Sequence, residues 1–255
     1  MPRLTRAAAL QAAALVAEAV GDADAPLVLP ETCRPGTVAA GRRIAALALD
    51  RLGLVSVGIR LAPGFDGGAA VAGPLIESRL LRSPAAVPPP GPGRRRCTLA
   101  VVAQLAAALA PRARRWRPAE VAARIASLHV AIDLAASRFA DGPPDLPQHV
   151  ADLAGLGLVI FGPPARAGWQ RAILEPLAAT VGPGGWRGGV DVGAALAAAA
   201  EEACAAGGLP AGAVLMVAGL SPAFADAPAS VRIARLGTAE RLAPPLQGSS
   251  PADRN

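Results

Sequence analysis

The chain has 255 residues, enough to bury a hydrophobic core in one domain or in a core with a small lobe. Its formal net charge is +6, but its 25 basic residues are all arginine and no aromatic platform accompanies them, so we expect no nucleic-acid partner. Cys33, Cys97 and Cys204 lie far apart, which excludes a disulfide framework and a CxxC metal site. Three widely spaced cysteines without a disulfide framework favour a reducing, cytoplasmic location.

The N-terminal third predicts helices. The first twenty residues imitate a signal peptide, with Arg3 and Arg6 before an apolar run. Gln11 and Glu18 interrupt that run, so we expect an amphipathic helix of the mature protein at 5–20. No segment has the roughly twenty uninterrupted apolar residues of a membrane span, so no membrane contact is expected. Thr37 predicts the N-cap of a second helix, which Gly53 ends.

Strand signals follow, separated by Pro and Gly. We predict a strand at 54–62 and a loop at 64–73, whereas the apolar run 98–109 fits either a strand or a helix. Pro118 is typical of a helix start and predicts a helix through residue 128. The remaining predictions are strands at 129–134, 157–161, 213–219 and 231–242, with a turn at Gly237, and a helix at 191–206.

Helices early and strands late indicate an α+β fold. We expect an N-terminal helical lobe with the first strands at 1–83, a Pro/Arg-rich connection at 84–96, a β core at 97–245 and a disordered tail at 246–255.

Four segments in this order resemble a known family. They are GIRLA at 58–62, LAPR at 109–112, VAIDLAASRF at 130–139 with ADLAGLGLVIFG at 151–162, and LPAGAVLMVAGLSP at 209–222. Together they resemble the 2-keto-4-pentenoate hydratase branch of the fumarylacetoacetate hydrolase superfamily. The resemblance implies a fumarylacetoacetate-hydrolase-like, mostly β core (a mixed β-roll) with an N-terminal helical lobe, and it implies oligomers.

The same resemblance implies a degenerate metal site. The family binds Mg²⁺ or Mn²⁺ through three carboxylates, and the matching positions here are Thr98, Ala100 and Asp133. Only Asp133 can ligate a hard cation as a carboxylate does. We therefore expect no metal cofactor.

Other candidate site residues follow from the same matches. Arg60 stands at the position of a substrate-contacting lysine, Ser137 and Arg138 remain from the family pattern, and His149 with Asp152 lies where the family has a polar loop. The predicted catalytic residues are Asp133, Arg60 and His149. The predicted substrate-binding residues are Arg138, Ser137 and Asp152.

The sequence also allows these side chains to pair with one another and not with a ligand. Asp133 could form a buried ion pair with Arg138 or with Arg60, and His149 could hydrogen-bond Asp152. His129, which precedes an apolar run, is expected to be a satisfied core residue.

Two functions remain at this point. The first is a hydratase-like protein that has lost metal-dependent catalysis and acts as a binding or scaffold subunit, in a homo-oligomer or in a complex with another protein. The alternative is a hydro-lyase or decarboxylase for a small 2-oxo acid, in which arginines bind the substrate carboxylate directly in place of a metal. Function depends on the site, so the fold does not choose between them.

Overall fold

The computed structural model describes residues 4–22, 26–88 and 95–242. The predicted tail at 246–255 and most of the Arg-rich end of the connection at 84–96 lie outside these ranges. The helices are α1 (Arg6–Gly21), α2 (Val38–Leu52), α3 (Pro118–Ala122), α4 (Leu146–Ala151), α5 (Trp169–Ala172) and α6 (Val192–Ala205). The strands are β1 (Ser56–Ala62), β2 (Val71–Ile76), β3 (Leu80–Arg82), β4 (Arg95–Leu105), β5 (Ile125–Ala136), β6 (Leu158–Pro164), β7 (Leu177–Val181), β8 (Arg187–Val190), β9 (Val214–Val217), β10 (Ser230–Ile233) and β11 (Gly237–Glu240).

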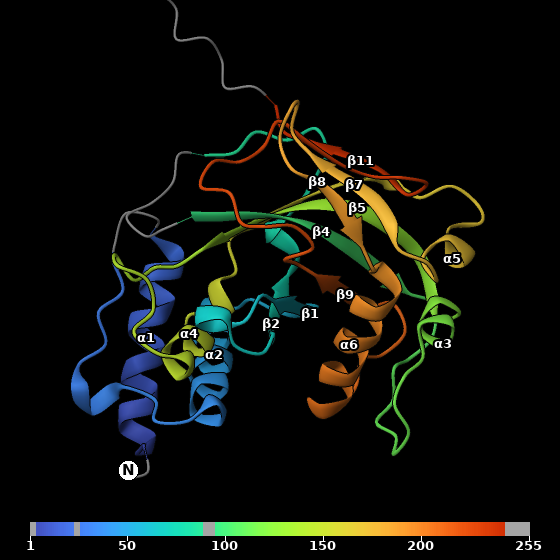
Figure 1. Cartoon of the computed structure of the whole chain (residues 1–255). Coiled ribbons are helices and arrows are strands. Elements are labelled where there is room, and N and C mark those ends of the chain that lie inside the picture. Colours follow the sequence, from blue (N-terminus) through green and yellow to red (C-terminus); the bar gives the residue numbers. More distant parts are fainter. Residues whose placement is uncertain (1–3, 23–25, 89–94, 243–255) are drawn as a thin grey trace, which may run out of the picture.

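Two sheets form the β core (Figure 1). The larger has seven strands in the order β2-β1-β9-β4-β5-β6-β3, and the smaller has four in the order β11-β10-β7-β8. The larger sheet is mixed, because β1 pairs with β9 and β3 with β6 in parallel, while its other pairs are antiparallel. The predicted α+β class with a mostly β core and N-terminal helices is confirmed.

The long hairpin-like pair β4 and β5 separates two hydrophobic cores. Successive side chains of a strand point to opposite faces, so Leu99 and Val101 enter one core while Ala100 and Val102 enter the other. The first core lies against α6 and the small sheet, and the second lies against the N-terminal helices. The polar residues discussed below lie on the second face.

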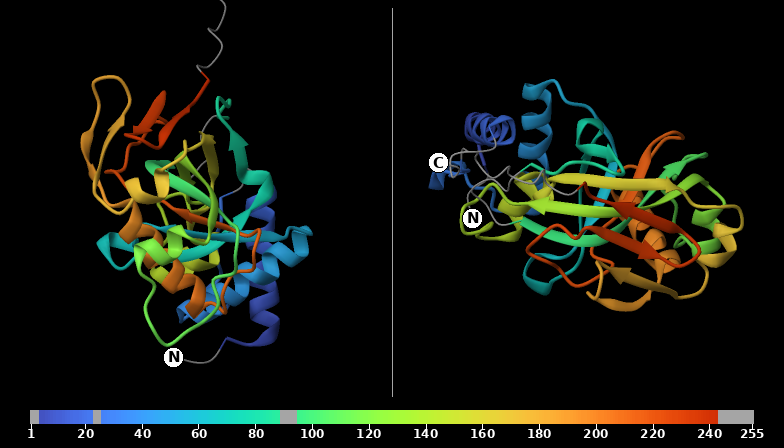
Figure 2. Two further views of the ribbon diagram at one scale, coloured as in Figure 1. Left: turned by 90° about the vertical axis from the view of Figure 1, so that its right-hand side faces the viewer. Right: turned by 90° about the horizontal axis from the view of Figure 1, so that it is seen from above.

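Local signals explain the helix ends. The side chains of Thr5 and Thr37 each accept a hydrogen bond from a backbone N–H of the first turn, at 3.1 Å. Gly53 ends α2 in the left-handed conformation, at φ 64°. Helices α1, α2 and α4 gather near one end of β4 and β5, whereas α3, α5 and α6 lie toward the other end (Figures 1 and 2). No helix of the described ranges is long and apolar enough to cross a membrane.

Three local predictions are wrong or incomplete. The segment at 98–109 is strand through Leu105 and irregular after it. The helix that begins at Pro118 ends at Ala122, because residues from Ile125 pair with β4 instead, Ile125 opposite Leu105. Strand pairing thus overrides a helix-like local pattern. Part of the predicted loop at 64–73 belongs to β2, which pairs along β1.

Candidate active site

A buried ion pair lies at the centre of the face toward the N-terminal helices. Arg60 is on β1 and Asp133 is on β5, with β9 and β4 between them in the sheet. The guanidinium of Arg60 donates from Nε to Oδ1 of Asp133 at 2.8 Å and from Nη2 to Oδ2 at 2.6 Å. Both side chains are only 1% exposed. Of the two pairings that the sequence left open for Asp133, the structure forms the one with Arg60.

Every nitrogen of the Arg60 guanidinium and both oxygens of the Asp133 carboxylate have a hydrogen-bond partner. The third group of the guanidinium, Nη1, donates to the backbone oxygen of Ala154 at 2.9 Å. Bidentate pairs of this kind fix geometry as well as charge. A buried pair costs desolvation, so removing either partner leaves an uncompensated charge.

The residues present do not fit a divalent metal ion. Asp133 has both oxygens on Arg60, and Thr98, which lies opposite Asp133 on β4, accepts the backbone N–H of Gly219 at 2.9 Å. The side chain of Ala100 has no atom that could ligate a cation. Within residues 4–22, 26–88 and 95–242 there is no group of three His, Cys, Asp or Glu side chains able to hold a metal ion.

A second buried arginine–carboxylate pair lies nearby. Asp152 is completely buried, and its carboxylate accepts from Nη1 of Arg138 at 3.0 Å, from the backbone N–H of Arg138 at 3.0 Å and from the hydroxyl of Ser137 at 3.4 Å. Burial raises the pKa of Asp152, and the contacts with Arg138 oppose that rise. The structure thus brings together the three residues predicted to bind substrate, as partners of one another.

Both arginines hold a left-handed turn at the wall of the site. Leu153, Ala154 and Gly155 have φ values of 53°, 52° and 67°, a conformation that non-glycine residues rarely adopt. Arg60 binds the oxygen of Ala154, and Arg138 donates to the oxygen of Leu156 at 2.6 Å. Such strain persists only where surrounding contacts over-determine the backbone.

His149, on α4, packs against this turn. A Cβ added to Gly155 would lie 3.1 Å from Cε1 of His149, so a side chain there would push the imidazole away by a few tenths of an ångström. The ring of Phe65 lies 6.0 Å away between centroids. Burial, followed by the guanidinium groups of Arg60 and Arg96, lowers the pKa of His149 to about 4. The imidazole is therefore neutral near pH 7.

One nitrogen of this neutral ring has no partner. Nδ1 of His149 is buried and makes no hydrogen bond to the described residues. The predicted hydrogen bond between His149 and Asp152 is wrong, because Asp152 is saturated by Arg138 and Ser137. By contrast His129 is satisfied, with Nδ1 at 2.9 Å from the oxygen of Gly162 and Nε2 at 3.0 Å from the hydroxyl of Ser127.

Sequence reasoning missed Arg96. From the sequence it belongs to the Pro/Arg-rich connection at 84–96, whereas the structure places it on β4 two residues before Thr98, so that both side chains are on the face of Asp133. Arg96 is exposed, has no partner among the described residues and influences His149 electrostatically. Alternate residues of a strand share a face, so residues 96, 98 and 100 point the same way once 95–105 is assigned as a strand. That pattern is the sequence signal for Arg96.

No family model and no curated protein matches the chain. Solved structures do match it. The structure of 4-oxalocrotonate decarboxylase from Pseudomonas putida G7, complexed with magnesium and adipate, covers 94% of this chain and 99% of its own, with a TM-score of 0.72 at 19% identity. The structure of the same enzyme complexed with calcium and acetate matches with a TM-score of 0.70 at 17% identity, and it also covers 94% of this chain and 99% of its own.

A more distant match is a probable 2-hydroxyhepta-2,4-diene-1,7-dioate isomerase from Mycobacterium abscessus, with a TM-score of 0.50 at 16% identity over 74% of each chain. The chain has a fumarylacetoacetate-hydrolase-like fold. At these identities the likeness establishes the fold alone, so the site must be argued from its own residues.

Proposed function

We propose that this protein binds a small 2-oxo acid beside His149 and acts on it as a metal-independent lyase of the hydratase or decarboxylase type. The observation on which this depends is the neutral, unpartnered Nδ1 of His149 beside two cationic side chains. A buried polar atom without a partner calls for an explanation, and a ligand that hydrogen-bonds to it is one. The fold agrees, because a decarboxylase crystallised with adipate, a dicarboxylate, spans nearly the same length.

In this proposal Arg96 binds the carboxylate of the substrate. Arg60 and Arg138 are both engaged with carboxylates of the protein, whereas Arg96 is exposed and has no partner in the part of the chain that is described. A guanidinium matches a carboxylate in two parallel hydrogen bonds. Arg60 and Arg138 then act as positioning residues, and direct substrate contact by Arg138, Ser137 and Asp152 stays a prediction.

His149 supplies the proton transfer. In hydration, Nδ1 accepts a proton from water as the hydroxide adds to the distal carbon of the enone, and that proton is returned to the neighbouring carbon, so one water is added overall. In decarboxylation the bond to the distal carboxylate breaks, carbon dioxide leaves, and the dienolate takes one proton from water, so that one proton is consumed from the solvent overall. The positive charge of Arg96 favours either anionic intermediate, whereas that of Arg60 is balanced by Asp133.

The direct test is turnover in the presence of EDTA. Purified protein is incubated with 2-hydroxypenta-2,4-dienoate or 4-oxalocrotonate, and loss of the conjugated absorbance and release of carbon dioxide are followed. We expect turnover above the uncatalysed rate, at least about a hundredfold lower in His149→Gln. Arg96→Ala should raise KM more than it lowers kcat, and Arg43→Ala, an exposed arginine on α2, is the matched control.

A second candidate function, binding without turnover, is favoured by a specific observation. Asp133, the remaining acidic residue of the resembled site, has both oxygens on Arg60 and so offers no free carboxylate to the reaction. Calorimetric binding of 2-oxoadipate that is lost in Arg96→Ala, with no product from either substrate, would select this function. Failure to bind any 2-oxo acid would reject both.

A further inference from the structure

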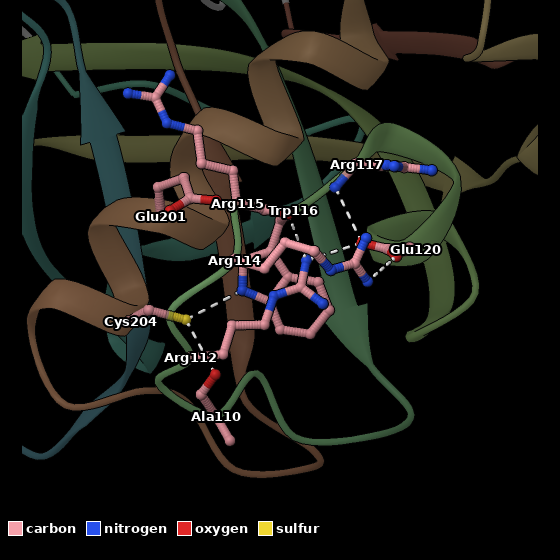
Figure 3. A network of polar contacts seen from close by, with 9 residues as sticks. All are labelled: Ala110, Arg112, Arg114, Arg115, Trp116, Arg117, Glu120, Glu201 and Cys204. Carbon is pink, nitrogen blue, oxygen red and sulfur yellow. Dashed lines mark hydrogen bonds and ion pairs between the residues drawn. The ribbon is translucent and has the colours of Figure 1, made fainter.

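The C-terminal end of β4 leads into a surface that has no part in the proposed function. Five arginines surround Trp116 between the end of β4 and the start of β5, and we call them the arginine patch: Arg112, Arg114, Arg115, Arg117 and Arg124. Figure 3 shows four of them around Trp116 and Glu120, with Cys204 of α6 at the left.

Trp116 fixes the segment on which the patch is built. Its side chain is only 7% exposed, and its Nε1 donates to the sulfur of Cys204 at 3.1 Å. The backbone N–H of Trp116 donates to the carboxylate of Glu201, also on α6. The guanidinium of Arg112 lies over the ring, 3.5 Å from its centroid. A surface held in this way loses little conformational entropy when it binds a partner.

The patch has more positive charge than its own carboxylates neutralise. Glu120 accepts from Arg112 at 2.7 Å and from Arg114 at 2.5 Å, and these contacts, that of Arg112 foremost, lower the pKa of Glu120 to about 2. Glu120 is thus saturated. Arg115 and Arg117 are exposed, and their guanidinium groups have no partner among the described residues. Figure 3 shows these two side chains extending away from Glu120 in different directions.

We propose that the arginine patch binds an acidic peptide segment of a protein partner. Several exposed, separately directed guanidinium groups suit a chain of carboxylates better than one small anion. Single-stranded nucleic acid would need an open aromatic face on which to stack, and the ring of Trp116 is buried beneath Arg112, with Arg124 also over it at 5.2 Å. The proposal is independent of the reaction at His149.

The test measures binding of a fluorescein-labelled oligoglutamate peptide to the full chain by fluorescence anisotropy, at about 0.15 M salt where weak long-range attraction is screened. We expect saturable binding that weakens about tenfold in Arg115→Ala/Arg117→Ala, because two unshielded cations are removed. The matched control is Arg187→Ala/Arg232→Ala, which removes the same charge from exposed positions on β8 and β10. It should change the affinity less than twofold.

Three results would overturn the proposal: no saturable binding of the peptide, an equal loss in both double variants, or tighter binding of a duplex or single-stranded DNA of the same charge. An equal loss would mean that net charge rather than the patch attracts the peptide. All four replaced side chains are exposed, and those of Arg115 and Arg117 make no hydrogen bond or ion pair with the described residues, so both variants should fold. Circular dichroism checks this.

Discussion

The two ends of β4 use arginine in opposite ways. At the end near the N-terminal helices, Arg60 is buried and Arg138 is 11% exposed, and each is matched by its own buried carboxylate, Asp133 and Asp152. At the other end, Arg112 and Arg114 share the carboxylate of Glu120, and the guanidinium groups of Arg115 and Arg117 have no partner among the described residues. Burial makes the first pairs structural, because an unpaired charge there is too costly, while solvent allows exposed arginines of the patch to lack a carboxylate partner. The same side chain is therefore part of the fold at one end and available to a partner at the other.

The largest effect should come from breaking the buried pair. Asp133→Ala leaves the guanidinium of Arg60 buried without its carboxylate and should lower the free energy of unfolding by about 3 to 5 kcal/mol. Urea denaturation measures this. Arg60→Met/Asp133→Leu removes both charges and should restore most of the loss, whereas a double variant as unstable as Asp133→Ala would show that the pair itself contributes net stability.

A smaller effect should come from His149. Its folded-state pKa of about 4 lies below the ordinary 6.5, so the unfolded chain binds the proton more readily. The associated stability is complete above pH 6.5 and is lost as the pH falls from 6.5 toward 4, up to about 3 kcal/mol. Unfolding free energies of the protein and of His149→Gln between pH 7 and 4 test this. Parallel curves for the two proteins would contradict it.

The exposed arginines should contribute little to folding. Because Arg115 and Arg117 have no partners in the described chain, replacing both by Ala should change the free energy of unfolding by no more than about 0.5 kcal/mol. Urea denaturation beside Asp133→Ala gives the contrast directly. A loss comparable with that of Asp133→Ala would mean that the patch belongs to the fold after all.

The smallest effect should come from added metal. A cation that binds the folded state raises the melting temperature by mass action. Since Asp133 is engaged with Arg60 and Thr98 with Gly219, millimolar Mg²⁺ or Mn²⁺ should leave the melting temperature unchanged. A rise that disappears in Asp133→Asn would show that the cation displaces Arg60 from the carboxylate.

Sequence reasoning predicted the elements whose signals are local. Thr5, Thr37 and Gly53 mark helix ends through hydrogen bonds within one turn or through backbone conformation, and α1, α2 and β1 appear where expected. It failed where pairing across the sheet decides the structure. The residues from Ile125 have a helix-like pattern and become strand only because β4 lies beside them.

In the candidate site, too, some properties follow from the sequence and others only from the tertiary structure. The sequence by itself determined which chemistry is available: Thr98 and Ala100 offer no carboxylates, and Asp133, Arg60 and His149 are present. Only the tertiary structure decided that Asp133 binds Arg60, that Asp152 binds Arg138, and that Arg96 influences His149 while having no partner within the described ranges. Residues 60 and 133 are far apart in the chain, and their contact depends on the strand order β1-β9-β4-β5 and on the face each side chain takes. Charge partners depend on distance in space and on burial, and composition and spacing determine neither.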